Sequence, residues 1–360
     1  MRGTDAATVR AALAESDPLP GTAGFAGERD GRLVRDVLGR EPLFSEADDP
    51  GAWSHDPADL DAPTAVPAGH VRDDRGDDRV WSLPDPPVES DREAAVAAVR
   101  DAVAESVREL DPGGLAVAFS GGLDSALVAA GVPEAPCYVA GFTGAHDVCA
   151  ARAAADAMDR DLRVVTLTHE DLRRAVPEVV RATGRANPMD VQIALPLYLV
   201  GERAAEDGFD RLAVGQGADE LFGGYAKVVD PATDHRVDAT TTRGATREVT
   251  ATLPDQLERD VLALRAAGVE PVAPLLHDRV VAAALPLPGD LLATADARKV
   301  ALRRAADGLV PDAVRTADKK AVQYGSYVAR ELDRLARQNG FKRRMDDHVG
   351  QYVASLVEDT

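Results

Sequence analysis

The sequence predicts an α/β protein built on a doubly wound, mostly parallel sheet, with a C-terminal helical portion and a small β-rich segment at its N-terminus. Strand-like and helical segments alternate between residues 90 and 214, which is typical of a parallel sheet with helices on both faces. Two of the predicted strands end in glycine-rich turns. Because ligands of such sheets bind beyond the carboxyl ends of the strands, both turns are expected at one ligand-binding edge.

The length and composition are those of a globular protein with one large or two ordinary domains. The chain has 360 residues and 45% hydrophobic residues, and its composition changes near residue 88, so we expect domains at 1–88 and 89–360. No apolar run reaches the ~18 residues of a membrane span, and no export signal is visible at the N-terminus. The two cysteines, Cys137 and Cys149, form no Cys-x-x-Cys pair. We therefore expect no zinc site, redox motif or disulfide framework. We expect a cytoplasmic location.

The charge is strongly acidic, with a formal net value of −20. Of the 41 basic residues only five are lysines, namely Lys227, Lys299, Lys319, Lys320 and Lys342. Abundant Asp, Ala and Arg with scarce Lys suits a salt-loving (halophilic) organism, where molar salt screens the self-repulsion; a merely acidic protein is the alternative. No basic patch that would bind nucleic acid is visible.

The elements can be placed in order from periodicity and breakers. A helix is predicted from Ser90, which forms a capping-box pattern with Glu93, to about residue 110. After it we expect strands and helices in alternation, namely strands at 115–119, 136–142, 162–167 and 211–214, with helices at 147–158, from about 170, and at 191–207. Residues 230–247 suit an exposed loop, and the remainder reads mainly helical.

The first glycine-rich turn, Ser120-Gly-Gly-Leu-Asp-Ser125, predicts a phosphate-binding loop. Its glycines permit a sharp turn, and the amides at the start of the next helix suit an anion. Asp124 lies where a phosphate-bound magnesium ion would be held. The turn lacks the Gly-x-x-x-x-Gly-Lys-Ser/Thr pattern of the common nucleoside-triphosphatase loop. A glycine-rich turn beside a buried strand is the simpler alternative.

The second turn follows the strand at 211–214 and reads Gly215-Gln-Gly-Ala-Asp219-Glu220-Leu-Phe-Gly-Gly-Tyr225. We expect Asp219 to face Asp124 across the top of the sheet and to share a magnesium ion that bridges the β and γ oxygens of ATP. Taken alone, Asp219-Glu220 would also suit a helix N-terminus stabilised by acidic residues.

The first turn resembles the loop of the ATP pyrophosphatases (PP-loop enzymes), which have an adenine nucleotide α-hydrolase-like fold. Both turns together resemble the synthetase domain of glutamine-dependent asparagine synthetase, a relation that includes the β-lactam synthetases. The resemblance covers about 90–330 well and continues through further runs, namely Gly268–Leu276, Arg298–Arg303, Leu309–Pro311 and Lys319–Gly325.

The resemblance implies roles for particular residues. Pyrophosphate would be held by the residues of the first turn, namely Ser120, Gly121, Gly122, Asp124 and Ser125. Adenosine would contact backbone groups at the strand ends, namely Phe119, Ala140, Val214 and Gly215. Asp219 would share the magnesium, and Lys319 would stabilise charge on an acyl-adenylate. A solvated surface lysine is the alternative for Lys319.

One position departs from the family pattern. Where asparagine synthetase usually has Glu, this chain has Gln216, which cannot act as a general base. Glu220 or Glu270 could substitute, or no base is needed if ammonia arrives neutral. The acceptor carboxylate, the nitrogen source and the oligomeric state therefore stay open.

The N-terminal segment resembles part of a glutaminase domain. Residues 33–44 and Pro67-Ala-Gly-His70 match pieces of the N-terminal-nucleophile glutaminase of asparagine synthetases. Such a glutaminase needs a first-residue cysteine, whereas Met1-Arg2 begin this sequence and no cysteine precedes Cys137. We interpret residues 1–88 as a truncated, inactive remnant, either a small β-rich module or a partly loose arm.

The expected activity is an ATP-dependent ligase that makes asparagine, AMP and pyrophosphate from aspartate, ATP and ammonia. Nitrogen would come from free ammonia or a separate glutaminase, and a homo-oligomer is a further possibility. Three alternatives are another acceptor acid, a tRNA-modifying thiolase, and a non-catalytic nucleotide-binding relative. The thiolase is disfavoured because reactive cysteines and a basic RNA surface are lacking.

Overall fold

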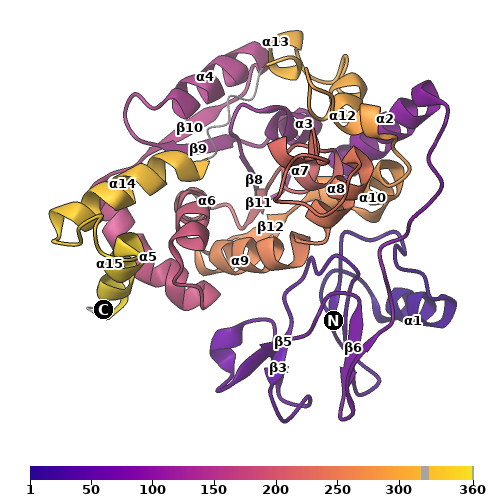
Figure 1. Ribbon diagram of the computed structural model, residues 1–360, viewed down its shortest axis with the longest axis horizontal. Helices are drawn as coiled ribbons and strands as arrows, with labels where there is room; N and C mark the ends of the chain where they lie inside the picture. Colours follow the sequence, from indigo (N-terminus) through magenta and orange to yellow (C-terminus); the bar gives the residue numbers. More distant parts are fainter. Residues whose placement is uncertain (318–323, 359–360) are drawn as a thin grey trace.

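The centre of the molecule is a five-stranded parallel sheet (Figure 1). The structure is a computed structural model and describes residues 1–317 and 324–358. The strands lie in the order β10-β9-β8-β11-β12, and every neighbouring pair is parallel. Their bounds are β8 Leu115–Ala118, β9 Cys137–Gly141, β10 Leu162–Thr166, β11 Arg211–Ala213 and β12 Glu270–Val272. The predicted α/β class is confirmed.

The strand order places a topological switch point at the middle of the sheet. From the central strand β8, the chain adds β9 and β10 on one side and then β11 and β12 on the other. The chain therefore leaves β8 toward one side of the sheet and β11 toward the other, and sheets of this kind bind their ligands at this point of the carboxyl edge. Both glycine-rich turns lie at this switch point.

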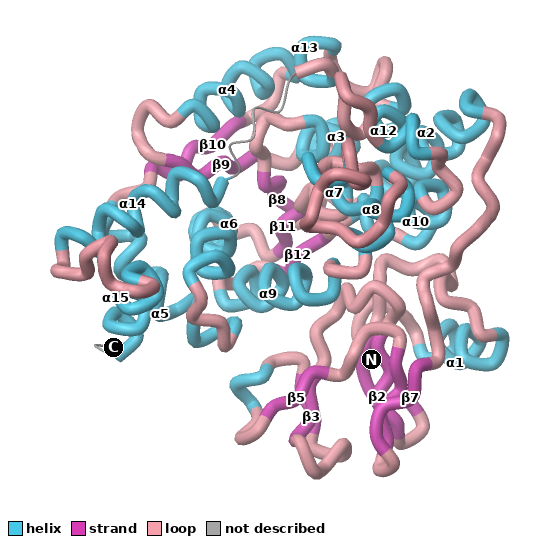
Figure 2. Tube along the Cα trace, in the orientation of Figure 1, coloured by secondary structure: helices cyan, strands magenta, loops and turns pink. Residues whose placement is uncertain are grey.

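Helices cover both faces of the sheet (Figure 2). In β9, Cys137 and Val139 pack into one hydrophobic cluster, and Tyr138 and Ala140 pack into the other. The first cluster includes residues of α2 Arg92–Arg108, α3 Leu123–Gly131, α4 His146–Met158, α10 Asp278–Ala284 and α12 Val300–Ala305. The second includes residues of α5 His169–Thr183, α6 Pro188–Glu206, α9 Leu253–Ala266, α14 Tyr324–Gln338 and α15 His348–Glu358. This two-sided burial is the doubly wound arrangement that the alternating pattern predicts.

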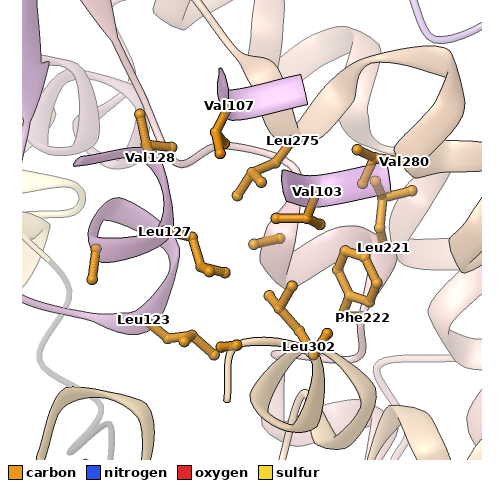
Figure 3. Packing of buried hydrophobic residues seen from close by; sticks show 14 of the residues in the cluster. Val103, Val107, Leu123, Leu127, Val128, Leu221, Phe222, Leu275, Val280 and Leu302 are labelled. Atoms are coloured by element: carbon orange, nitrogen blue, oxygen red, sulfur yellow. The ribbon is translucent and has the colours of Figure 1, made fainter. Parts of the chain in front are cut away.

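The first cluster includes side chains that immediately follow the two glycine-rich turns in the sequence, and they pack together (Figure 3). Leu123 and Leu127 come from α3, and Phe222 follows the short helix α7 Ala218–Leu221. Leu302 of α12 completes the contact between these segments. Close packing of this kind gives the turns a fixed base.

Two local predictions are wrong, and one strand was not predicted. The cap of α2 is Asp91, whose carboxylate accepts from two amides of the first turn, so Ser90 does not cap the helix. Residues 230–247 are not all loop, because α8 Thr242–Thr250 begins there, capped by Thr241. β12 was not predicted, because its three residues include Pro271 and only pairing with β11 makes them a strand.

The remaining described elements are short. In the C-terminal half they are η2 Ala226–Val228, η3 Pro274–Leu276, α11 Gly289–Leu292 and α13 Asp312–Arg315. Among the helices of residues 1–317 and 324–358, none combines the length and apolar character that crossing a membrane requires.

Residues 1–88, here called the N-terminal module, form two small antiparallel sheets below the main sheet (Figure 1). One contains β1 Ala26–Arg29, β2 Arg32–Arg35, β6 His70–Asp73 and β7 Gly76–Arg79. The other contains β3 Phe44–Glu46, β4 Trp53–Ser54 and β5 Pro63–Ala65, and the module also includes α1 Ala6–Glu15 and η1 Pro57–Asp59. The segment is therefore a folded module rather than a loose arm.

A buried ion network fastens the N-terminal module to the rest of the chain. The Arg40 guanidinium pairs with Asp36 within the module at 2.8 Å and with Asp278 of α10 at 2.7 Å. Arg40 also donates to the Leu276 carbonyl, and the Thr22 amide donates to Asp278. Because all three charged groups are at most 5% exposed, the network holds only while each charge is paired.

Replacing Arg40 tests this attachment. Arg40→Met leaves two carboxylates buried without their cation, so we expect the free energy of unfolding to fall by about 3–5 kcal/mol. Denaturant titration followed by tryptophan fluorescence measures it, because both tryptophans, Trp53 and Trp81, belong to the module. Arg75→Met, at an exposed turn, is the control. Equal midpoints for the two variants would contradict the role of the network.

Candidate active site

The first turn is held in shape by its own hydroxyl groups. The buried Ser125 hydroxyl accepts from the Ser120 amide and donates to the Gly122 carbonyl, both at 3.2 Å. Gly121 has φ +75°, and a Cβ there would lie 2.7 Å from the Cα of Ala151 in α4. Only glycine suits this position, because the backbone is left-handed and closely packed.

The second turn lies directly against the first. A Cβ added to Gly215 would approach the Asp124 backbone to 3.0 Å. Asp124 is in the first turn of α3, and Asp219 is in the first turn of α7. The strand order thus brings together two acidic residues that are 95 positions apart in the sequence.

The two carboxylates share one cation. The Lys299 ammonium lies 2.6 Å from Asp124 Oδ2 and 2.7 Å from Asp219 Oδ1. Lys299 is only 4% exposed, which a lysine tolerates only when its charge is paired. Burial alone would lower the pKa of Lys299, but the two carboxylates outweigh it and the pKa is raised. The ammonium is therefore charged at neutral pH.

Lys299 is a site residue that the sequence reasoning did not assign. It belongs to the Arg298–Arg303 run and is one of only five lysines. These two features of the sequence could have indicated it as a site residue. Its position depends on a tertiary contact, however. It caps α12 with a left-handed backbone at φ +56°, and α12 packs beside both turns.

The other residues expected to hold pyrophosphate or adenosine also gather at this edge. Phe119, Val214 and Gly215 immediately follow strands β8 and β11, and Ala140 is near the end of β9. The amide of Phe119 donates to the Tyr138 carbonyl, and that of Val214 donates to the Val272 carbonyl. Both amides are thus engaged within the sheet. Lys319 lies outside the described residues.

Glu220 is turned towards a tyrosine rather than towards Lys299. Its carboxylate accepts from the Tyr225 hydroxyl at 2.6 Å, and its backbone carbonyl accepts from Thr250. Burial raises the pKa of Glu220. Through these hydrogen bonds Glu220 helps to hold the second turn in its conformation.

Glu270 lies at the wrong edge of the sheet to serve as a base. It is the first residue of β12, in register with Arg211, the first residue of β11. Its carboxylate pairs with Arg265 at the strands' amino ends. Glu270 also lines a surface cavity between α9 and the N-terminal module. Trp53 and His55 of the module line the same cavity. This cavity is away from Asp124 and Asp219.

Gln216 has a buried acidic partner. Its side-chain amide donates to Asp260 of α9, which is 6% exposed. Asp260 also accepts from Arg259 at 2.7 Å, and Arg259 continues to Asp190 at 2.9 Å. Burial raises the pKa of Asp260 despite the arginine. The neutral amide of Gln216 therefore donates to the Asp260 carboxylate, which a glutamate at position 216 would repel.

The donor set of this edge fits a phosphate-bound divalent cation. Asp124 Oδ1 is buried and has no hydrogen-bond partner among the residues that the structure describes. Carboxylate oxygens are the ligands that Mg²⁺ prefers. Two carboxylates with phosphate oxygens and water would suffice for such an ion.

Comparison with known proteins identifies the family of the chain. The family model for asparagine synthase matches residues 96–247 and 229–349. A putative glutamine-hydrolysing asparagine synthetase of Methanocaldococcus jannaschii is 28% identical over 73% of this chain and 54% of the relative.

Two further relatives match shorter regions. The nodule asparagine synthetase of Pisum sativum is 31% identical over 30% of this chain and 21% of its own. An asparagine synthetase of Bacillus subtilis is 30% identical over 39% and 23%, respectively. The chain thus spans about half the length of the first relative and less of the others.

The hydrogen bond between Gln216 and Asp260 can be tested by replacing Gln216 with a second acid. Gln216→Glu places two carboxylates together in a buried position, so we expect a loss of about 1–3 kcal/mol in stability. The pair should retain a proton to a higher pH than in the unfolded chain, so the loss should grow as pH rises above about 4. Urea titrations at pH 5 and pH 8 measure this.

The double variant Gln216→Glu/Asp260→Asn is the matched control. It restores a carboxylate–amide pair with the donor on the other side, so most of the lost stability should return. Equal stability of Gln216→Glu and the native protein at pH 8 would refute the pairing.

Proposed function

Because the chain belongs to the asparagine synthase family, we propose that it is an ATP-dependent amide-forming ligase that converts aspartate and ammonia into asparagine. The observation that carries the proposal is the convergence of Asp124 and Asp219, from two glycine-rich turns, on one point at the switch point of the sheet. This is the place where a doubly wound sheet binds its ligands.

The proposed reaction has two steps. An oxygen of the substrate carboxylate attacks the α-phosphorus of ATP, and the bond to the β-phosphate oxygen breaks. The products are an acyl-adenylate and pyrophosphate. Ammonia then attacks the acyl carbon, AMP leaves with the electron pair of the broken C–O bond, and the nitrogen loses a proton. Gln216 cannot take that proton.

Asp124 and Asp219 are the residues that would hold Mg²⁺, and the ion would neutralise charge on the phosphates of ATP. The first turn would bind the departing pyrophosphate through Ser120 and the amides at the start of α3. By the family resemblance, Lys319 would stabilise charge at the acyl group.

The nitrogen source is proposed to be free ammonia or a separate glutaminase. Both cysteines of the sequence lie outside the N-terminal module, Cys137 in β9 of the main sheet and Cys149 in α4. Burial raises the pKa of the Cys137 thiol to about 12, which keeps it protonated. The N-terminal module is accordingly proposed to be an inactive glutaminase remnant, and the protein to work in the cytoplasm at high salt.

A carboxylic acid other than aspartate is the second candidate for the acceptor. Gln216 bonded to Asp260 is the specific observation that favours a different carboxylate, because it changes the family pattern beside the second turn. A panel of carboxylic acids, each tested for pyrophosphate release from ATP, distinguishes the two substrates.

The activity is tested with the purified chain in molar KCl with Mg²⁺, ATP, ammonium and aspartate. We expect asparagine, AMP and pyrophosphate in equal amounts. Asp124→Asn and Asp219→Asn should each lower the rate by about 10²-fold or more, because each removes charge that balances the cation at the phosphates. Asp74→Asn, at an exposed turn of the module, removes the same charge elsewhere and should leave the rate unchanged.

Two results would count against the proposal. ATP binding without AMP formation for any acid would indicate a non-catalytic relative. Glutamate release from glutamine, at a rate matching AMP formation, would show that the chain has its own glutaminase.

A further inference from the structure

We infer that Lys299 is an internal counter-ion that holds Asp124 and Asp219 together before the nucleotide binds and keeps a divalent cation from binding there without ATP. The inference rests on the proposed function for the identity of the ligand. It makes Lys299 a positioning residue that sets the order in which metal and nucleotide bind.

The geometry places the ammonium between the two carboxylates. Its distances of 2.6 and 2.7 Å to Asp124 Oδ2 and Asp219 Oδ1 are those of close ion pairs, and the contact with Asp124 is also a charge-assisted hydrogen bond. A Mg²⁺ ion needs its oxygens at about 2.0–2.1 Å. The same two oxygens cannot hold both cations, so a metal ion arriving alone must displace Nζ or bind beside a like charge.

The backbone keeps Lys299 from moving away. Lys299 has a left-handed backbone at the start of α12, with φ +56°, a conformation that residues other than glycine rarely adopt. Its carbonyl accepts from the Arg303 amide at 2.8 Å, and Arg298 donates to the Gly224 carbonyl at 2.9 Å. With 4% of its surface exposed, Lys299 is part of the packed structure and not a solvated side chain.

Charge balance explains why ATP would change the outcome. Two carboxylates and one ammonium carry a net charge of about −1, which attracts a divalent cation weakly while the ammonium repels it at short range. An ammonium has three N–H donors, and one of them goes to Asp124 Oδ2. Phosphate oxygens would supply both a partner for a further donor and further ligands for the metal ion.

Removing the ammonium should therefore create a metal site. In Lys299→Met the two carboxylates face each other without this counter-ion, so the nucleotide-free protein should bind Mn²⁺ at least about tenfold more tightly than the native protein. Electron paramagnetic resonance titration of free Mn²⁺ against the full chain measures the affinity. Lys342→Met, at an exposed position, should behave like the native protein.

Two further measurements keep the inference open to refutation. In Lys299→Met/Asp124→Asn the gain in Mn²⁺ affinity should disappear, which assigns it to this pair. In the native protein, α,β-methylene-ATP should raise Mn²⁺ affinity at least about tenfold, and this measurement needs no variant to fold. Equal Mn²⁺ binding by Lys299→Met and the native protein, or by native protein with and without the analogue, would overturn it.

The inference and the proposed function can fail separately. If the native chain makes no AMP but Lys299→Met binds Mn²⁺ more tightly, the counter-ion role stands and the ligase proposal falls. If the native chain makes asparagine and AMP but Lys299→Met gains no Mn²⁺ affinity, the ligase proposal stands and the counter-ion role falls.

Discussion

The pairing of one buried ammonium with two carboxylates joins three segments that are far apart in the sequence. Asp124 follows β8, Asp219 follows β11, and Lys299 begins α12. Two carboxylates this close would repel each other strongly in a partly buried setting, so the two turns need a cation between them to stay in contact. The packing of α12 against α3 and the second turn places that cation (Figure 3). The fold thus provides a charge that the two turns alone lack.

A second set of charged residues connects the N-terminal module to the rest of the chain. Arg40 reaches across to Asp278, and Arg35 lies 3.5 Å from Glu258 of α9. Glu258 also pairs with Arg185, and Asp190 lies between Arg185 and Arg259. Arg259 pairs with Asp260, which accepts a hydrogen bond from Gln216 in the second turn. A chain of ion pairs therefore runs from the module to the candidate site. Arg35, Arg259 and Asp260 are the buried members, so these three charges depend on their partners in the chain.

Part of the fold and of the site can be predicted from the sequence because it depends on local chemistry. Alternating apolar runs give β8 to β11 and the helices between them, and two glycine-rich turns locate Asp124 and Asp219. Predictions failed where local signals were weak or competing. Asp91 rather than Ser90 caps α2, since both are good capping residues and tertiary placement chose between them. β12 exists only because β11 pairs with it, and Glu270 lies at its amino end for the same reason.

By itself, the sequence determined the α/β class, the two turns and the acidic residues that follow them, because strand periodicity and glycine-rich turns are short-range properties of a chain. Only the tertiary structure decided which cation meets those acids and which acid meets Gln216. Lys299 and Asp260 come from helices whose contacts with the turns depend on packing over long sequence separations. Pairwise distances between buried charges are set by that packing and not by the residues next to them in the chain.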